Sequence, residues 1–181
     1  MDYLILVKIV LALPWLLCLS IRDIRKHELP NAWVMDGILV MLAIALGVGV
    51  EYLIGSLVTA FFSSLFLLLP FFLRAAGAGD VKMLFAAGLI AGPWNTLNLI
   101  LLVSLSGLVL ACVMLFLRQV NPVRVKHFCR CLFDFRYDRV EGRRNLPSPE
   151  TESCRVPFGV AISAGLLLNL LLQLFYSMEV A

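Results

Sequence analysis

The chain has 181 residues, of which 61% are hydrophobic and only 15% are charged, and its formal net charge is +3. A soluble globular domain usually carries about 25% charged residues, so the composition excludes that class and predicts an all-α, polytopic membrane protein. We expect residues 1–181 to form a single bundle of about six transmembrane helices in a lipid bilayer. The sequence shows no internal repeat and no nucleic-acid-binding motif, so we expect no nucleic-acid partner.

The first apolar stretch, residues 3–21, is long enough to cross a bilayer. A basic cluster follows it and no small-x-small cleavage site does, which distinguishes this stretch from a signal peptide. Positive charges at its far end place that end in the cytoplasm and the N-terminus outside. Lys8 lies inside the stretch, and we expect its ammonium group to extend outward to the headgroups.

A short polar loop, residues 22–31, leads from the first span to the second, residues 32–50. Pro30 favours an extended backbone at the residue before it, and Asn31 can cap the second helix. The third span, residues 51–73, then returns to the cytoplasmic side.

The second span contains small residues and one acid. Ala43 with Gly47 and Ala45 with Gly49 are four residues apart, a spacing that predicts close helix packing in lipid. Asp36 lies about one turn inside the span, where an acid costs free energy unless something offsets it. It could belong to an active site, hold helices together by hydrogen bonds, or reach water. We favour the last two roles.

The fourth apolar segment begins at Asp80, after a Gly-Ala-Gly run, and ends at Gly92. Glycines permit positive φ and close backbone approach, so the run predicts a tight turn. The segment spans about 20 Å as a helix, less than the hydrocarbon core of about 30 Å. Either the helix begins nearer Arg74, or Asp80 lies below the headgroups in a thinned or water-filled region. The simplest structural role for Asp80 is a helix N-cap.

The fifth span, residues 98–117, precedes the only long polar segment, residues 118–155. This segment holds nine Lys or Arg and five Asp or Glu, a balance that favours the cytoplasm. Its first part, residues 123–137, has the spacing of an amphipathic helix lying on the membrane surface. The sixth span, residues 156–178, contains Asn169 and Gln173, which we expect to bond across helices. Both termini are then outside.

Counting spans places Asp23 and Asp80 on the same side, at the end of the first span and the start of the fourth. A bundle can therefore bring the two carboxylates together, and close carboxylates tend to share one proton. Such a pair can hydrolyse a peptide bond: the ionised member takes a proton from water, and the protonated member polarises the carbonyl oxygen. The alternative for Asp23 is a salt bridge to Arg22 or Arg25, which topology alone leaves equally open.

The chain contains three short runs, in order: Asp23 and Arg25 with residues 29–31, then residues 77–82, then residues 156–159. These runs resemble the signatures of the type IV prepilin peptidases, which are membrane aspartic proteases of the GxGD type. The resemblance implies that Asp23 and Asp80 are the catalytic residues. It also implies a prepilin substrate, whose leader peptide is cleaved at the cytoplasmic face of the bacterial plasma (inner) membrane, just ahead of a hydrophobic helix. The residues that support the three signatures are Arg25, Pro30 and Asn31, then Gly77, Gly79 and Lys82, then Pro157 and Gly159.

Larger members of that family carry an additional cytoplasmic domain with paired C-x-x-C motifs and an N-methyltransferase activity. This sequence contains no C-x-x-C motif and no counterpart of that domain, and it resembles the short, peptidase-only form found with Flp or tight-adherence pili. We therefore expect a peptidase without methylation and without a cofactor. Lys82, two positions beyond Asp80, should face away from it and serve as an interfacial anchor or a remote contact.

The cysteines offer a weaker alternative. Cys18 and Cys112 lie in predicted spans and are expected to be small apolar fillers. His127, Cys129, Cys131 and Cys154 share the polar segment and could supply four zinc ligands, but their spacing is not the usual one, so we expect no metal.

A competing function is a transporter or a pilus or secretion assembly factor that uses membrane acids as a proton path. That function predicts acids at the midplane of the bilayer. The positions of Asp23 and Asp80 at one edge instead favour the protease.

Overall fold

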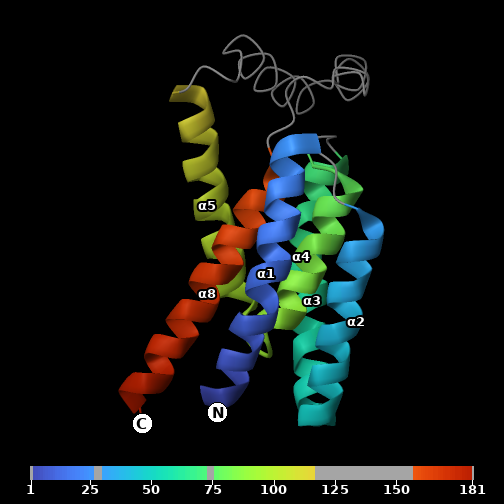
Figure 1. Cartoon of the computed structure of the whole chain (residues 1–181), viewed down its shortest axis with the longest axis vertical. Helices are drawn as coiled ribbons and strands as arrows, with labels where there is room; N and C mark the ends of the chain where they lie inside the picture. The colour runs from blue at the N-terminus through green and yellow to red at the C-terminus, as the bar shows by residue number, and fades with distance from the viewer. Residues whose placement is uncertain (1, 27–29, 73–75, 117–156, 181) are drawn as a thin grey trace.

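A computed structural model describes residues 2–26, 30–72, 76–116 and 157–180 of the chain (Figure 1). Within these residues the regular secondary structure is entirely helical, which confirms the predicted all-α bundle. The helices are α1 (Asp2–Lys26), α2 (Asn31–Val48), α3 (Val50–Phe72), α4 (Ala78–Ala91), α5 (Thr96–Phe116) and α8 (Phe158–Val180). The polar segment 118–155, with its expected amphipathic helix and its candidate zinc ligands, lies outside the described residues.

The helices alternate in direction, as the count of spans predicts. Figure 1 places both termini at one end of the bundle, while α1 ends and α4 and α8 begin at the other end. Among the described residues, α1, α2, α3, α5 and α8 are long and apolar enough to cross a membrane. The remaining helix, α4, has 14 residues and a length of about 21 Å.

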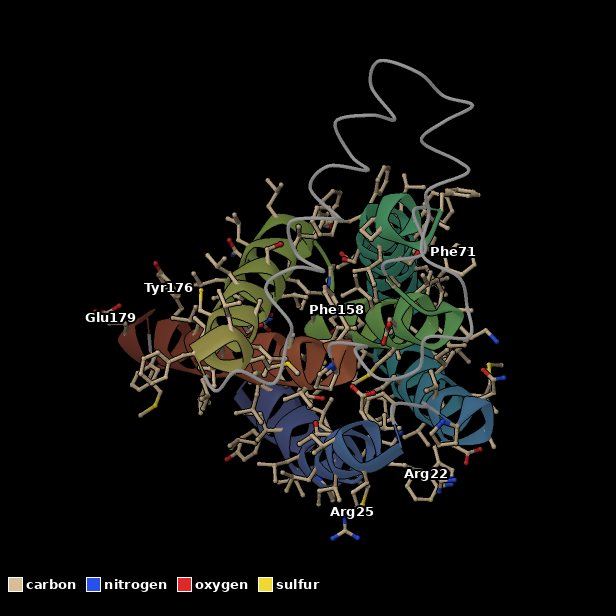
Figure 2. All side chains as sticks on the ribbon, turned by 90° about the horizontal axis from the view of Figure 1, so that it is seen from above. Arg22, Arg25, Phe71, Phe158, Tyr176 and Glu179 are labelled. Atoms are coloured by element: carbon tan, nitrogen blue, oxygen red, sulfur yellow. The ribbon has the colours of Figure 1, made fainter. Side chains whose placement is uncertain are left out.

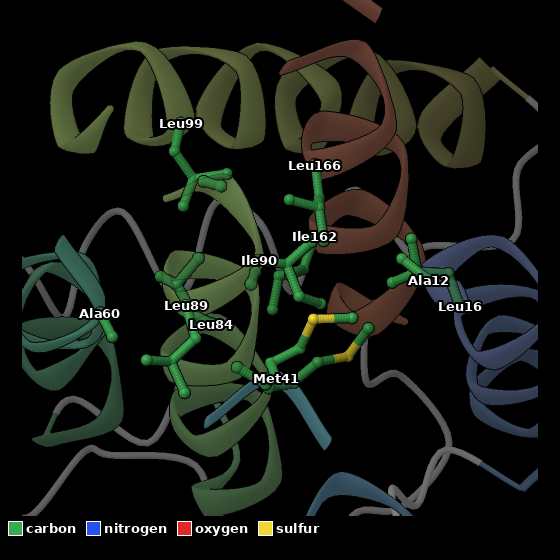
Figure 3. Close-up of a cluster of buried hydrophobic side chains, with 14 of the residues drawn as sticks. Ala12, Leu16, Met41, Ala60, Leu84, Leu89, Ile90, Leu99, Ile162 and Leu166 are labelled. Atoms are coloured by element: carbon green, nitrogen blue, oxygen red, sulfur yellow. The ribbon is translucent and has the colours of Figure 1, made fainter. Parts of the chain in front are cut away.

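Helix α4 is short because it begins only at Ala78, with Gly77 as its N-cap. The helix thus begins two residues nearer Arg74 than Asp80 does, and it is still shorter than the hydrocarbon core of about 30 Å. Helix α4 is also the centre of the bundle, since it packs against α3, α2 and α8 and its residues 83–91 are buried, except for the partly buried Phe85. A helix that is apolar on every side belongs in such a position. Figure 3 shows Leu84, Leu89 and Ile90 of α4 surrounded by side chains from its neighbours.

Of the small residues that we expected to pack closely, Ala45 is buried, but the tightest glycine contacts between helices occur elsewhere. A Cβ on Gly88 of α4 would lie 2.4 Å from the Cα of Ala60 in α3, and one on Gly165 of α8 would lie 2.6 Å from the Cα of Val103 in α5. By contrast, Gly47 has no atom within 4 Å of its Cβ position, so the prediction for Ala43 and Gly47 is wrong. Spacing alone identified small residues but not the face that carries the contact.

One polar side chain of α8, that of Gln173, holds this helix to α4. The Gln173 side chain donates hydrogen bonds to Asn169 Oδ1, at 2.6 Å, and to the backbone oxygen of Ala91, at 3.0 Å. The expected bond across helices therefore exists, but Gln173 makes it, while Asn169 bonds within α8.

Lys8 does not extend outward as expected. Its side chain is only 3% exposed, and its Nζ lies 5.1 Å from the centre of the Tyr52 ring of α3. Nζ also lies 2.9 Å from the position of a Cβ on Gly92, whose φ of +87° suits glycine. The bundle has space for Lys8 because α4 ends there at Ala91, and the tyrosine ring provides a favourable surface for the cation.

Candidate active site

Asp23 lies inside α1 rather than in the loop we predicted, because α1 continues to Lys26. Its side chain is 4% exposed, and it continues a buried stripe that also contains Leu16 and Leu19. Residues three and four apart share one face of a helix. The extra turn of α1 therefore points the Asp23 carboxyl group into the bundle.

The two arginines beside Asp23 point elsewhere. The guanidinium group of Arg22 lies over the ring of Trp33 in α2, 5.0 Å from the ring centre. Arg25 is exposed, and Figure 2 shows it directed away from the bundle. The buried carboxyl group of Asp23 and the exposed side chain of Arg25 therefore lie on different faces of α1.

Asp80 is the third residue of α4 and not its N-cap, so the N-cap prediction is wrong in position. The N-cap is Gly77, and its backbone N–H donates a hydrogen bond of 2.9 Å to Asp80 Oδ2. A carboxylate in the first turn is also stabilised by the helix dipole. Asp80 is half-buried. It therefore closes the first turn of α4 and still has access to the surface of the bundle.

The glycines before Asp80 do not form the turn that the sequence suggested. Gly77 has φ of −86° and ψ of 158°, an extended conformation open to any residue, and Gly79 lies inside the first turn of α4. Positive φ among the described glycines occurs at Gly49 and Gly92. Gly77 and Gly79 have no side chains, and they therefore leave space beside Asp80.

Asn31 and Lys82 meet across two helices. The Lys82 Nζ donates a 3.1 Å hydrogen bond to Asn31 Oδ1. Asn31 makes this bond instead of capping α2, whose N-cap is Pro30 and has no side-chain capping bond. Lys82 is exposed, as expected, and its contact is with α2. The first and second runs of motif residues along the chain are thus joined by a direct contact.

The start of α8 lies at the same end of the bundle (Figure 1). Pro157 and Gly159 are buried, and the backbone oxygen of Gly159 accepts a 2.8 Å bond from Ser163 Oγ. Figure 2, looking down on this end, shows Phe158 in the middle, close to α4. The structure therefore gathers Asp23, Asp80 and all three motif regions at one end of one bundle.

The other candidates lie elsewhere. Asp36 is exposed on α2, whose buried face carries Val34, Ile38, Met41 and Ala45, so it points away from the bundle. Cys18 and Cys112 are exposed and fill no interior space. In the described ranges there is no group of three or more side chains able to hold a metal ion.

Comparison with protein families decides the identification. The family model described as the type IV leader peptidase family matches residues 10–112, more than half of the chain. The chain belongs to this family. The match includes Asp23 and Asp80, whereas Pro157 and Gly159 lie beyond it. No curated protein and no solved structure matches the chain.

Membership in the leader peptidase family makes the protein a peptidase, and its long apolar helices place it in a membrane. Sequence reasoning missed one set of residues near the site of this leader peptidase. The Trp15 Nε1 donates a 2.7 Å bond to the backbone oxygen of Trp33, and Trp33 also carries Arg22 on its ring. The presence of a tryptophan in each of the first two spans was the available signal in the sequence. Residue spacing does not show which groups these tryptophans contact.

Proposed function

We propose that this protein is an aspartic endopeptidase that removes the leader peptide of Flp-like type IV prepilins. In this proposal the protein lies in the inner membrane of a bacterium, and the end of the bundle that carries Asp23 and Asp80 faces the cytoplasm. The observation that carries the proposal is the placement of a buried acid, Asp23, at the same end as a half-buried acid, Asp80. Both acids lie within the region that matches the family.

The chemistry follows from the different surroundings of the two acids. A shared proton leaves one carboxylate to activate water and one carboxylic acid to polarise the scissile carbonyl. Asp80 has one oxygen, Oδ2, that accepts the Gly77 N–H, and this bond holds its carboxyl group at the start of α4. Asp23 is fixed by burial in the last turns of α1.

The position of the site suits cleavage at the edge of a membrane helix. Helix α4 begins near the edge of the bundle, and the glycines beside Asp80 present no side chains to an approaching backbone. A peptide bond just ahead of a substrate's hydrophobic helix would lie at this depth. The basic residues of segment 118–155 and of α1 favour the cytoplasm for this end.

The competing transporter function has less support. It requires acids along a path through the bilayer, whereas Asp23 and Asp80 share one end and Asp36 faces outward. The position of Asp23 and Asp80 at one end of the bundle supports a protease rather than a transporter.

Co-expression with candidate prepilins from the same genome tests the proposal. We expect a shift to a smaller product on a gel, with an N-terminus just ahead of the hydrophobic helix. A candidate prepilin shortened in the middle of its mature domain serves as the control, because it keeps the cleavage site. Failure to shorten any candidate, with the peptidase present in the membrane, would contradict the proposal.

A further inference from the structure

The two helices that carry the acids have different main partners. Helix α1 packs chiefly on α8, and α4 packs chiefly on α3. Helix α2 packs on α4 and also contacts α1. The first turn of α2, residues 31–33, lies at the end of the bundle where both acids are found. We call these three residues the α2 bridge.

The α1 side of the bridge is held by two contacts to one residue. Trp15 Nε1 donates its 2.7 Å bond to the backbone oxygen of Trp33, and the Arg22 guanidinium covers the Trp33 ring. Arg22 is the residue directly before Asp23. Gly37 makes room for this arrangement, because a Cβ there would lie 2.4 Å from the Trp15 ring.

The α4 side of the bridge is held by the bond between Lys82 and Asn31, at 3.1 Å. Lys82 lies two residues beyond Asp80, in the same first turns of α4. The α2 bridge therefore contacts α1 at Arg22, next to Asp23, and contacts α4 at Lys82, two residues beyond Asp80.

We propose that Trp33 and Asn31 are positioning residues, which hold α1 and α4 at the separation that the Asp23 and Asp80 carboxyl groups need to work together. This inference rests on the proposed function of the two acids. Displacement of a reacting group by about 1 Å can lower a rate by about a hundredfold. Neither residue needs to contact the substrate for this role.

Steady-state cleavage tests the α1 side. Trp33→Leu removes the ring that carries Arg22, and we expect kcat to fall by about tenfold or more with KM changed less than about twofold. Trp33→Phe keeps a ring face and should restore most of kcat. The double variant Trp33→Leu with Arg22→Met should be no worse than Trp33→Leu alone, because both changes remove the same contact. Trp94→Leu is the matched control, since Trp94 is 90% exposed and follows the end of α4 that is remote from Asp80.

The α4 side is tested by Asn31→Leu, which removes the acceptor of the Lys82 bond without touching Trp33. It should lower kcat by about threefold or more, in line with the modest strength of one hydrogen bond. If Trp33→Leu and Asn31→Leu leave kcat within twofold of the parent, or raise KM alone, the positioning role is wrong.

A measurement without activity separates this inference from the proposed function. Ile24 and Ala78 are exposed on α1 and α4, and cysteines placed there, in a variant lacking the five native ones, can be linked by bis-maleimides of graded length. We expect a narrow range of effective spacers in the parent and a broader range in Trp33→Leu or Asn31→Leu. The same range in all three would overturn the inference, even if the protein cleaves prepilin. A broader range with no cleavage by the parent would uphold the bridge and contradict the proposed function.

Discussion

The backbone N–H of Gly77 donates a 2.9 Å hydrogen bond to Asp80 Oδ2, so the acid near the start of α4 also closes the first turn of that helix. Asp80 thus has a structural role that does not depend on its proposed chemistry. The two roles can be separated, because an amide oxygen accepts a hydrogen bond but a neutral amide cannot take or share the proton.

The first prediction concerns this capping bond. Asp80→Asn should keep it, while Asp80→Ala should lose it and reduce the free energy of unfolding by about 1 kcal/mol, as the loss of other helix caps does. Thermal unfolding of the purified protein in detergent measures the difference. Equal unfolding temperatures for the two variants would show that the bond contributes nothing to stability.

The second prediction compares two glycines of the bundle. Gly88→Val should destabilise the protein by about 1–3 kcal/mol or more, because its Cβ would lie 2.4 Å from the backbone of Ala60, which cannot move aside cheaply. Gly47→Val is the matched control, with no atom within 4 Å of its Cβ position. Thermal unfolding and the yield of monodisperse protein measure both. Similar losses for the two variants would contradict the packing of α3 on α4.

The sequence predicted the all-α bundle and the placement of Asp23 and Asp80 at one end of it, for identifiable reasons. Long apolar stretches and the placement of basic residues determine the number and alternation of helices, and these place Asp23 and Asp80 at one end. The sequence could not predict the extension of α1 to Lys26. A run of charged residues after an apolar stretch is typical of a loop, but a helix can also continue through it.

The face of a helix on which a given side chain lies was harder to predict. Lys8 was expected to reach outward but is buried beside Tyr52. The sequence could not predict this, because nothing in an apolar stretch indicates which face of the helix packs against Tyr52. Asn31 was expected to cap α2 and instead accepts a bond from Lys82, which lies 51 residues away. Contacts between distant segments depend on the packing of whole helices, and residue spacing carries no information about them.

The third prediction concerns Lys82. Lys82→Arg should retain most cleavage, because a guanidinium group can still donate to Asn31 Oδ1. Lys82→Met should reduce cleavage, though less than Asp80→Asn does. Initial rates with a saturating prepilin concentration measure the series. A loss with Lys82→Arg as deep as with Asp80→Asn would make Lys82 part of the chemistry.

The fourth prediction concerns orientation. Segment 118–155 holds nine Lys or Arg, and we expect it in the cytoplasm. A fluorescent or galactosidase reporter fused near Pro147 should be active, and an alkaline phosphatase fused there should be silent. The reverse pattern would place the end that carries both acids on the outer face and exclude processing in the cytoplasm.

The most direct test of the account is cleavage of a prepilin by Asp23→Asn and Asp80→Asn, with Asp36→Asn as the control acid on the outer face of α2. We expect both active-site variants to insert normally in the membrane and to give no shortened product, while Asp36→Asn stays within about tenfold of the parent. Substantial cleavage by either Asp23→Asn or Asp80→Asn would contradict the proposed pair. Loss of cleavage in Asp36→Asn at a normal protein level would indicate that Asp36, rather than Asp23, pairs with Asp80.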